Sequence, residues 1–348
     1  MACSGGDRWR RADVDAVNYI VGIDIGGTNL VLGAVSEDGS SLHGFRKEPT
    51  RAEEGPDAVV ARLVGLSRQA IEDTRAVDPT AKIIGVGIGS PGPLDRVTGR
   101  VLITPNLGWT NFPLRDAIQK GLALPAALDN DANCAVLGEW WHGAARHTQH
   151  TVGITVGTGI GGGIIIDGKL YHGFSEVAGE LGHTTIDSDG RLCKCGNYGC
   201  LEAYAAGPAI ARRAVEAVKA GINSSLPEYV SGNLEALDAQ IVYEAARDGD
   251  DLALEVVRET SRLLGTGIAN LVNIFNPEVV VVCGGVTMAG ASLFDPLRQE
   301  VRRRAFRPAA EACRIVPGEL IGTAGVYGAA RAFIDQRADG LIDTSPHA

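Results

Sequence analysis

The N-terminal part of the chain alternates short apolar runs with turn residues. Residues 20–25 and 30–35 are almost wholly apolar, and glycines at positions 26–27 lie between them. A third strand can run over 42–47, after the Asp-Gly turn at 38–39. Short apolar runs bounded by turn residues are typical of buried β-strands. This segment therefore predicts a strand, a tight glycine turn, a second strand and a hairpin.

Longer segments have the periodicity of amphipathic helices. In residues 56–74 the apolar positions fall three or four apart, as one buried face of a helix requires. The pattern recurs over 207–220 and 252–275, and a final helix rich in small residues is predicted over 325–335. Further strands are predicted at 82–88, 126–128 and 278–282. This mixture of strands and helices predicts an α/β fold.

An internal repeat organises this pattern. The sequence VGIDIGGT of residues 21–28 corresponds to VGITVGTG of residues 152–159, which lies 131 residues further along the chain. In each copy an apolar strand and an Asp-Gly turn follow the glycines. Chance is the weaker explanation, because the match extends to the following strand and turn. The repeat therefore predicts a fold built twice, with two lobes that face a cleft.

The two glycine turns are candidates for phosphate binding. Glycine permits a ligand to approach the backbone closely, and consecutive amide groups in such turns bind anions. Asp24 precedes the first turn, where a carboxylate would repel phosphate but would bind the Mg²⁺ that accompanies a nucleotide. Thr28 and Thr158 add hydroxyl donors. A tight turn without a ligand is the alternative for either turn taken singly.

Two familiar nucleotide motifs do not fit their surroundings. Residues 157–162 match the spacing G-x-G-x-x-G, but that fingerprint requires a helix next, and residues 164–166 predict a strand. Residues 163–169 resemble a P-loop, yet Leu170 replaces the hydroxyl residue that would hold the metal. The Asp-Gly pair at 167–168 is better explained as a hairpin turn.

Three of the seven cysteines lie within eight residues. Cys193, Cys195 and Cys200 follow His183, and three thiolates with one imidazole suit a closed tetrahedral Zn²⁺ site. A disulfide is disfavoured, because Cys193 and Cys195 are too close in sequence and a reducing compartment is expected. If one ring nitrogen of His183 binds zinc, the other is left as an N–H donor of fixed tautomer.

The zinc loop would also present polar groups to a polyol. Glu180 precedes His183 by three residues, and Glu202 follows the last cysteine of the cluster by two. Two carboxylate acceptors beside a fixed imidazole donor can bind the hydroxyls of a polyol. A solvated surface carboxylate is the alternative for either glutamate alone.

The segment LDNDAN, residues 128–133, lies between a predicted strand end and a predicted helix start. The side chain of Asp131 or Asn130 could cap that helix. Asp131 could instead be a general base at the cleft. Because the transition state of phosphoryl transfer is loose, a carboxylate of ordinary pKa would suffice for that role. The residues themselves leave both roles open.

Composition excludes several classes of protein. The chain has 348 residues, enough for two domains, and its hydrophobic content of 45% indicates a packed fold. Its net charge of −10 opposes general binding to nucleic acid, which needs a basic surface. No apolar run approaches the ~18 residues of a membrane span, and residues 1–18 are interpreted as a loose, disordered tail without an export signal. We therefore expect a cytoplasmic protein with free thiols.

Several motifs together resemble the ROK (repressor, open reading frame, kinase) family of sugar kinases. They are DIGGTN at 24–29, NDAN at 130–133, GTGIGGG at 157–163, ELGH at 180–183 and CKCGNYGCLE at 193–202. The resemblance runs from residue 19 to residue 335, and the cysteine–glycine block is its most specific part. It implies a two-lobed, actin-like and hexokinase-type ATPase fold with duplicated, ribonuclease H-like lobes. It also implies ATP as donor, a hexose as acceptor and a structural zinc.

The resemblance implies a role for each candidate residue. Asp131 would be the base on the sugar 6-hydroxyl, and Asp24 would attend the Mg²⁺. The sugar would be bound by Asn106, Asn130, Asp131, Glu180, His183 and Glu202. The phosphates would be held by Gly26, Gly27, Thr28, Gly157, Thr158 and Gly159, and the adenosine would lie near Gly284 and Gly285. The zinc would be held by His183, Cys193, Cys195 and Cys200.

Within the family the chain is most similar to bacterial glucokinases, through TPNLGW at 104–109 and the complete zinc block. Phosphorylation of glucose at the 6-hydroxyl by MgATP is expected, with mannose, fructose or N-acetylmannosamine as alternative acceptors. A non-catalytic sugar-sensing regulator is a further alternative. Repressors of the family carry a DNA-binding domain ahead of the first glycine turn, and the 23 residues before Asp24 are too few for one.

The resemblance also predicts the domain boundaries. The small lobe is expected to comprise residues 19–130 with about 319–336. The large lobe is expected to comprise 131–318 and to carry the zinc loop and a dimerisation surface. A homodimer or homotetramer is the expected assembly, with no nucleic-acid or membrane partner.

Overall fold

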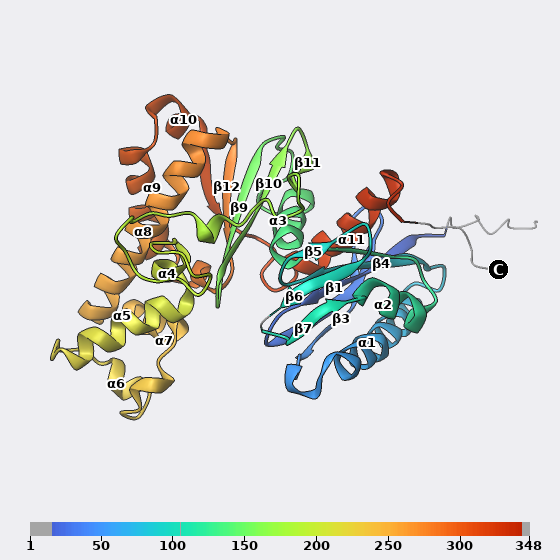
Figure 1. The fold of residues 1–348 in the computed structure, drawn as a ribbon, viewed down its shortest axis with the longest axis horizontal. Helices are drawn as coiled ribbons and strands as arrows, with labels where there is room; N and C mark the ends of the chain where they lie inside the picture. Colours follow the sequence, from blue (N-terminus) through green and yellow to red (C-terminus); the bar gives the residue numbers. More distant parts are fainter. Residues whose placement is uncertain (1–15, 105, 343–348) are drawn as a thin grey trace, which may run out of the picture.

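The chain folds into two lobes, each built on a five-stranded sheet (Figure 1). The computed structural model describes residues 16–104 and 106–342. The first sheet has the order β3-β2-β1-β4-β8 and contains β1 (Asn18–Ile25), β2 (Asn29–Ser36), β3 (Leu42–Pro49), β4 (Lys82–Ser90) and β8 (Ala126–Asn130). The second sheet has the order β11-β10-β9-β12-β13 and contains β9 (Thr151–Val156), β10 (Ile160–Ile166), β11 (Lys169–Leu170), β12 (Val279–Cys283) and β13 (Arg314–Pro317).

The two sheets have the same topology. β1 pairs antiparallel with β2 and parallel with β4, and β9 pairs antiparallel with β10 and parallel with β12. The strands that the internal repeat aligns, β1 with β9 and β2 with β10, therefore hold equivalent places in the two sheets. The predicted α/β fold with duplicated lobes is confirmed.

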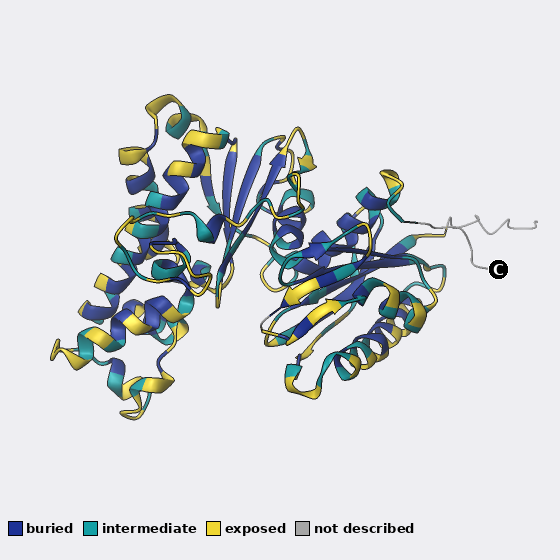
Figure 2. Ribbon diagram, in the orientation of Figure 1, coloured by how far each residue is buried: buried dark blue, intermediate teal, exposed yellow. Residues whose placement is uncertain are grey.

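The first sheet buries both of its faces, because successive side chains of a strand point to opposite sides. Val21 packs on one side into a core with α1 (Pro56–Val77) and α2 (Leu114–Leu122). Ile20 packs on the other side against α11 (Ala324–Ala338). Figure 2 shows this burial along the strands of both sheets. The C-terminal helix thus belongs to the small lobe, where it is expected.

A smaller sheet of three strands was not predicted. It consists of β5 (Leu94–Asp95), β6 (Arg100–Thr104) and β7 (Trp109–Phe112). Trp109 is buried and packs against Phe112, whereas Ile103 on β6 is exposed. Strands this short have too few residues to develop a clear alternation of apolar and polar positions.

Helices cover one face of the second sheet with the largest hydrophobic core of the molecule. The longest is α8 (Asp251–Phe275), which agrees with the helix predicted over 252–275. The others are α4 (Glu202–Ala205), α5 (Gly207–Lys219), α6 (Leu226–Tyr229), α7 (Ala239–Arg247), α9 (Ala291–Arg304) and α10 (Arg307–Ala312). Four short 3₁₀ helices complete the secondary structure of the described residues: η1 (Ala52–Glu54), η2 (Leu181–His183), η3 (Leu234–Ala236) and η4 (Gly285–Ala289).

Helix α3 (Asp131–Trp141) lies at the junction of the lobes (Figure 1). It packs on β9 and β10 of the large lobe and most extensively on α11 of the small lobe. A Cβ atom on Gly328 would lie 1.6 Å from the carbonyl oxygen of Cys134, so the two helix backbones are in direct contact. The lobe boundary expected at residue 131 thus falls at the start of a helix that contacts both lobes.

The N-terminal tail predicted over 1–18 lies mostly outside the described residues. Strand β1 begins at Asn18, the last residue of that range. Within the described residues, no helix combines the length and the apolar character needed to cross a membrane.

Candidate active site

A cavity of about 620 Å³ lies between the two lobes. Thr28 belongs to the part of its lining that comes from the small lobe, and Thr158 to the part from the large lobe. The cavity is also lined by all six residues expected to bind sugar: Asn106, Asn130, Asp131, Glu180, His183 and Glu202. The fold therefore brings together residues that are spread over nearly a hundred positions of the sequence.

Both glycine turns open onto this cavity. The amide of Gly26 donates to the carbonyl of Asn29 (2.9 Å), and the amide of Gly157 donates to the carbonyl of Gly159 (2.9 Å). These two glycines close their turns with their own N–H groups. The amides of Gly27, Thr28, Thr158 and Gly159 have no acceptor among the described residues and are the groups available to an anion.

A second cavity of about 700 Å³ adjoins the first at Gly157 and Thr158, which line both. Its remaining lining is largely apolar and includes Ile210 and Gly285. Gly284 does not line it. That glycine has a φ of 93°, and a Cβ on it would lie 2.2 Å from the carbonyl oxygen of Val156, so Gly284 allows the sharp turn after β12.

The structure decides which side chain caps α3. The Oδ1 atom of Asn130 accepts hydrogen bonds from the amides of Ala132 (2.9 Å) and Asn133 (3.2 Å), so Asn130 is the cap. Asp131 is the first residue of the helix and is only partly exposed. Burial raises the pKa of its carboxyl to about 6, and the charge of Glu180 adds to the shift. The pKa of this candidate base is therefore higher than the ordinary value that would suffice for the role.

Asp24 lies near the end of β1, behind the first glycine turn. Burial raises the pKa of its carboxyl to about 7, and the charge of Asp131 raises it further. A Cβ on Gly325 of α11 would lie 2.3 Å from Asp24 Oδ2. Any larger residue at that position would therefore clash with the carboxylate. Two poorly solvated carboxylates with raised pKa values, beside a turn of free amides, fit a site for Mg²⁺ with a bound polyphosphate.

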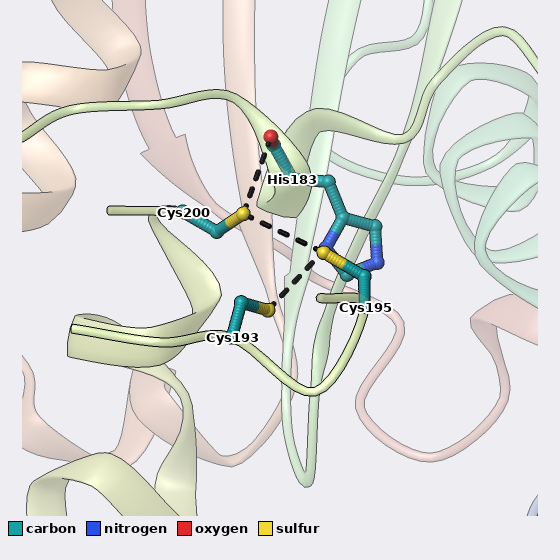
Figure 3. A group of neighbouring side chains, drawn as sticks. All are labelled: His183, Cys193, Cys195 and Cys200. Carbon is teal, nitrogen blue, oxygen red and sulfur yellow. Dashed lines mark hydrogen bonds between the residues drawn. The ribbon is translucent and has the colours of Figure 1, made fainter. Parts of the chain in front are cut away.

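The four residues expected to bind zinc point toward one another (Figure 3). His183 Nδ1 lies 3.7 Å from Cys193 Sγ, and the Sγ atoms of Cys195 and Cys200 are also 3.7 Å apart. All four candidate ligand atoms lie within 4.8 Å of one another. Tetrahedral bonds of about 2.3 Å separate two sulfur ligands by about 3.8 Å, so this cluster has the dimensions of a zinc site.

His183 belongs both to this candidate zinc cluster and to the lining of the first cavity, which we call the acceptor cavity. Its Nδ1 atom faces Cys193, whereas its Nε2 atom lies 3.9 Å from Glu180 Oε2 on the cavity side. Glu202 makes a second connection, because its Oε2 accepts the amide of Ile160 (2.9 Å) at the end of the second glycine turn. The cluster thus supports one wall of the cavity.

The sequence profile of the ROK family matches residues 20–336. The chain belongs to the ROK family. Among its relatives, the glucokinase of Thermotoga maritima is 39% identical over 92% of this chain and 98% of that enzyme. The xylose repressor of Caldicellulosiruptor bescii is 34% identical over 83% of this chain and 71% of the repressor. The structure of a ROK family glucokinase from Streptomyces griseus, in complex with glucose and AMPPNP, is similar with a TM-score of 0.78, at 34% identity over 90% of this chain and 98% of that one.

Four ionisable residues next to the acceptor cavity of this ROK protein were missed by the sequence analysis: Arg96, Asp129, His172 and Glu176. Asp129 is buried, and burial would raise its pKa. The hydrogen bond with His172 and the charges of His172 and Arg96 outweigh that effect, so the pKa of Asp129 is lower than usual. The only signal in the sequence was the position of Asp129 beside the predicted base.

Proposed function

We propose that the protein transfers the γ-phosphoryl group of MgATP to the 6-hydroxyl of glucose, which yields glucose 6-phosphate and ADP. One observation carries the proposal: the six expected sugar-binding side chains and both glycine turns line a single cavity between the lobes. Similarity to glucokinases over nearly the whole length of both chains supports glucose as the acceptor.

On the acceptor side, Asp131 takes the proton of the reacting hydroxyl. A carboxylate with a pKa of about 6 accepts a proton at neutral pH more readily than an ordinary aspartate does. His183 Nε2 donates to a sugar hydroxyl, and Glu180 accepts from one. These groups orient the acceptor, and since the transition state is loose, orientation is a large part of catalysis in phosphoryl transfer.

On the donor side, the free amides of the two turns hold the phosphates from both lobes. Gly27 and Thr28 act from the small lobe, and Thr158 and Gly159 act from the large lobe. Asp24 would hold the Mg²⁺ that accompanies the nucleotide, and that ion would neutralise negative charge on the phosphates. The largely apolar second cavity, beside Gly285, accommodates the adenosine.

The zinc has a structural role in this proposal. A closed site of three thiolates and one imidazole leaves no coordination position for a substrate. Its effect on the sugar is indirect: ligation at Nδ1 leaves the hydrogen of His183 on Nε2, which faces the cavity. The same loop places Glu202 beside the second glycine turn.

Assembly and cellular location stay predictions. Membership of the ROK family is consistent with a homodimer or homotetramer, and light scattering on the purified protein measures which of these forms. We also retain the expectation of a cytoplasmic enzyme of sugar metabolism.

A panel of hexoses tests the proposal. Purified protein is mixed with MgATP and glucose, mannose, fructose or N-acetylmannosamine, and ADP release is followed by a coupled assay. The highest kcat/KM is expected with glucose. A higher value with another hexose would change the assigned acceptor. Sugar binding without turnover on any hexose would instead indicate a sugar-sensing regulator.

A further inference from the structure

Two carboxylates, one guanidinium and one imidazole connect the two lobes next to the acceptor cavity. Arg96 follows β5 and Asp129 lies on β8, both in the small lobe. His172 and Glu176 lie in the large lobe, in the loop of residues 171–180 between β11 and η2. We call these four residues the interlobe clasp.

Two interactions of the clasp cross from one lobe to the other. The guanidinium of Arg96 donates from NH2 to Glu176 Oε1 (3.1 Å), and its Nε pairs with the other oxygen of the same carboxylate. His172 Nε2 lies within hydrogen-bond distance of Asp129 Oδ2 (2.9 Å). A bidentate pair of this kind fixes direction as well as distance.

Arg96 also joins the two interactions to each other. Its NH1 lies 3.9 Å from Asp129 Oδ2, the oxygen that His172 contacts. The side chains of Asp129 and Arg96 are 3% and 14% exposed, so solvent screens them little. Breaking a buried pair leaves an uncompensated charge and is costly.

Each end of the clasp lies beside a residue that faces the sugar. Asp129 Oδ1 accepts the amide of Asn130 (2.8 Å) and the side-chain amide of Asn133 (3.2 Å), which holds the start of α3. Glu176 lines the acceptor cavity together with the segment that leads to Glu180. The clasp therefore connects the small-lobe side of the sugar site to its large-lobe side.

Glu176 has a left-handed backbone, with a φ of 64°. That conformation is strained for a non-glycine residue, and it persists only where interactions with neighbouring groups stabilise it. The ion pair with Arg96 is the interaction that holds the side chain of Glu176 here. Without it, we expect the loop to relax and to carry Glu180 away from the acceptor.

We propose that the clasp positions the acceptor site: Arg96 and His172 hold the loop of Glu176 and Glu180 in register with Asn130 and Asp131. This inference rests on the proposed sugar kinase function. Arg96 and His172 are positioning residues, because they act on the acceptor through Glu176 and Asp129. Their loss is expected to weaken use of the sugar and to spare nucleotide binding, since the second cavity contains no clasp residue.

Arg96→Gln tests the clasp, with Arg100→Gln as the matched control. Arg100 begins β6, four residues after Arg96, and its guanidinium donates to Asn111 rather than to the loop of residues 171–180. We expect Arg96→Gln to raise the KM for the preferred hexose about 10- to 100-fold, the size of effect that a small misplacement of reacting groups produces. Binding of an ATP analogue, measured by calorimetry, should stay unchanged, and Arg100→Gln should behave as the wild type does.

Two further variants exclude a purely structural role. Arg96→Lys keeps the charge but lacks the fork that bridges two carboxylates, so it should stay impaired. The double variant with Arg96→Gln and Glu176→Gln should raise KM by less than the product of the single effects. An unchanged KM for the sugar in Arg96→Gln would contradict the positioning role of the clasp. Equal losses of affinity for sugar and for nucleotide, together with a lowered Tm, would contradict it as well. Absence of wild-type turnover on every hexose would instead reject the proposed function, and the role of the clasp with it.

Discussion

The two halves of the protein share a sheet topology but differ in the chemistry that each places at the cleft. Asp24 on β1 corresponds to Thr155 on β9 in the internal repeat. Asn130 ends β8 and is followed by Asp131, whereas Pro317 ends β13, the equivalent strand of the second sheet, and is followed by Gly318. Carboxylates therefore lie next to the ends of β1 and β8 in the small-lobe sheet, and neutral residues lie at the corresponding positions of β9 and β13 in the large lobe.

Electrostatics gives a reason for this asymmetry. A polyphosphate between the lobes repels carboxylates, which are tolerated only where a divalent cation or a transferable proton compensates them. Burial already raises the pKa of both Asp24 and Asp131, and the charge of Asp131 adds to the shift of Asp24. A second pair in the large lobe would add repulsion without a second metal to offset it. The repeat thus gives both lobes the same frame, whereas the positions of Asp24 and Asp131 carry a carboxylate only in the first copy.

The largest expected effect concerns the base. Asp131→Asn removes the proton acceptor and should lower kcat by about 10²–10⁴-fold. Sugar binding should persist, because Asn106, Glu180 and His183 remain. Coupled ADP release and calorimetry with the preferred hexose measure the two quantities. Wild-type turnover in this variant would show that Asp131 is not the general base.

The same variant should be more stable than the wild type. The native pKa of about 6 lies above the ordinary value of 3.8, so the Asp131 carboxylate opposes folding as pH rises between these values and above them. At pH 7, Asp131→Asn should raise the free energy of unfolding by about 1–3 kcal/mol, and at pH 4 the gain should nearly vanish. Urea unfolding at both pH values checks this sign.

The next effect tests the asymmetry directly. Asp24→Asn should lower kcat/KM for MgATP by about 10²–10³-fold, because it removes a charge that stabilises the transition state through the metal. Thr155→Val, at the equivalent position of the other lobe, should have a much smaller effect. Steady-state kinetics over a range of Mg²⁺ concentrations separates metal affinity from turnover. Equal losses in the two variants would contradict a division of chemistry between the lobes.

The zinc cluster should have a smaller effect, confined to the large-lobe side of the sugar site. Cys195→Ser should lower the zinc content and weaken hexose binding about 10- to 100-fold, since it disturbs the ligand sphere that orients His183. Cys313→Ser is the control, because that cysteine lies outside the cluster. Metal analysis and calorimetry measure the two outcomes. Full sugar affinity in zinc-free protein would show that sugar binding does not depend on the metal.

The mildest perturbation is a change of pH. Asp131 must be deprotonated to accept the hydroxyl proton, so kcat/KM for the hexose should fall about tenfold per pH unit below a pKa of about 6. The profile should be recorded at saturating MgATP, because bound Mg²⁺ favours the charged form of Asp24. A profile that stays flat down to pH 5 would contradict the raised pKa of the base.

The sequence predicted the repeated strand–turn–strand units because each is local. The apolar run, the glycines and the hairpin of each copy are contiguous, and the structure places them as β1–β2 and β9–β10. The helix over 252–275 could also be predicted, because a helix with one buried face has apolar residues three or four positions apart in the sequence. The four candidate zinc ligands could also be grouped from the sequence, since three of them lie in one short loop and their chemistry is specific, and the structure brings all four together.

Other features could not be read in this way. The short strands β5, β6 and β7 carry little periodicity. The ion pair of Arg96 with Glu176 joins residues 80 positions apart, and the contact of His172 with Asp129 joins residues 43 apart. A single sequence holds no local pattern that links such partners.

By itself, the sequence determined the duplicated α/β frame and the glycine turns, and it supplied the candidate residues for a zinc site and for binding a sugar and a phosphate. These depend on residue type and on spacing along the chain. The tertiary structure alone decided that Asn130 rather than Asp131 caps α3, and that the pKa of Asp131 and of Asp24 is raised. It also decided that four ionisable side chains from distant parts of the sequence connect the lobes. Burial and the distance between charges set these properties, and both arise only when remote segments pack together.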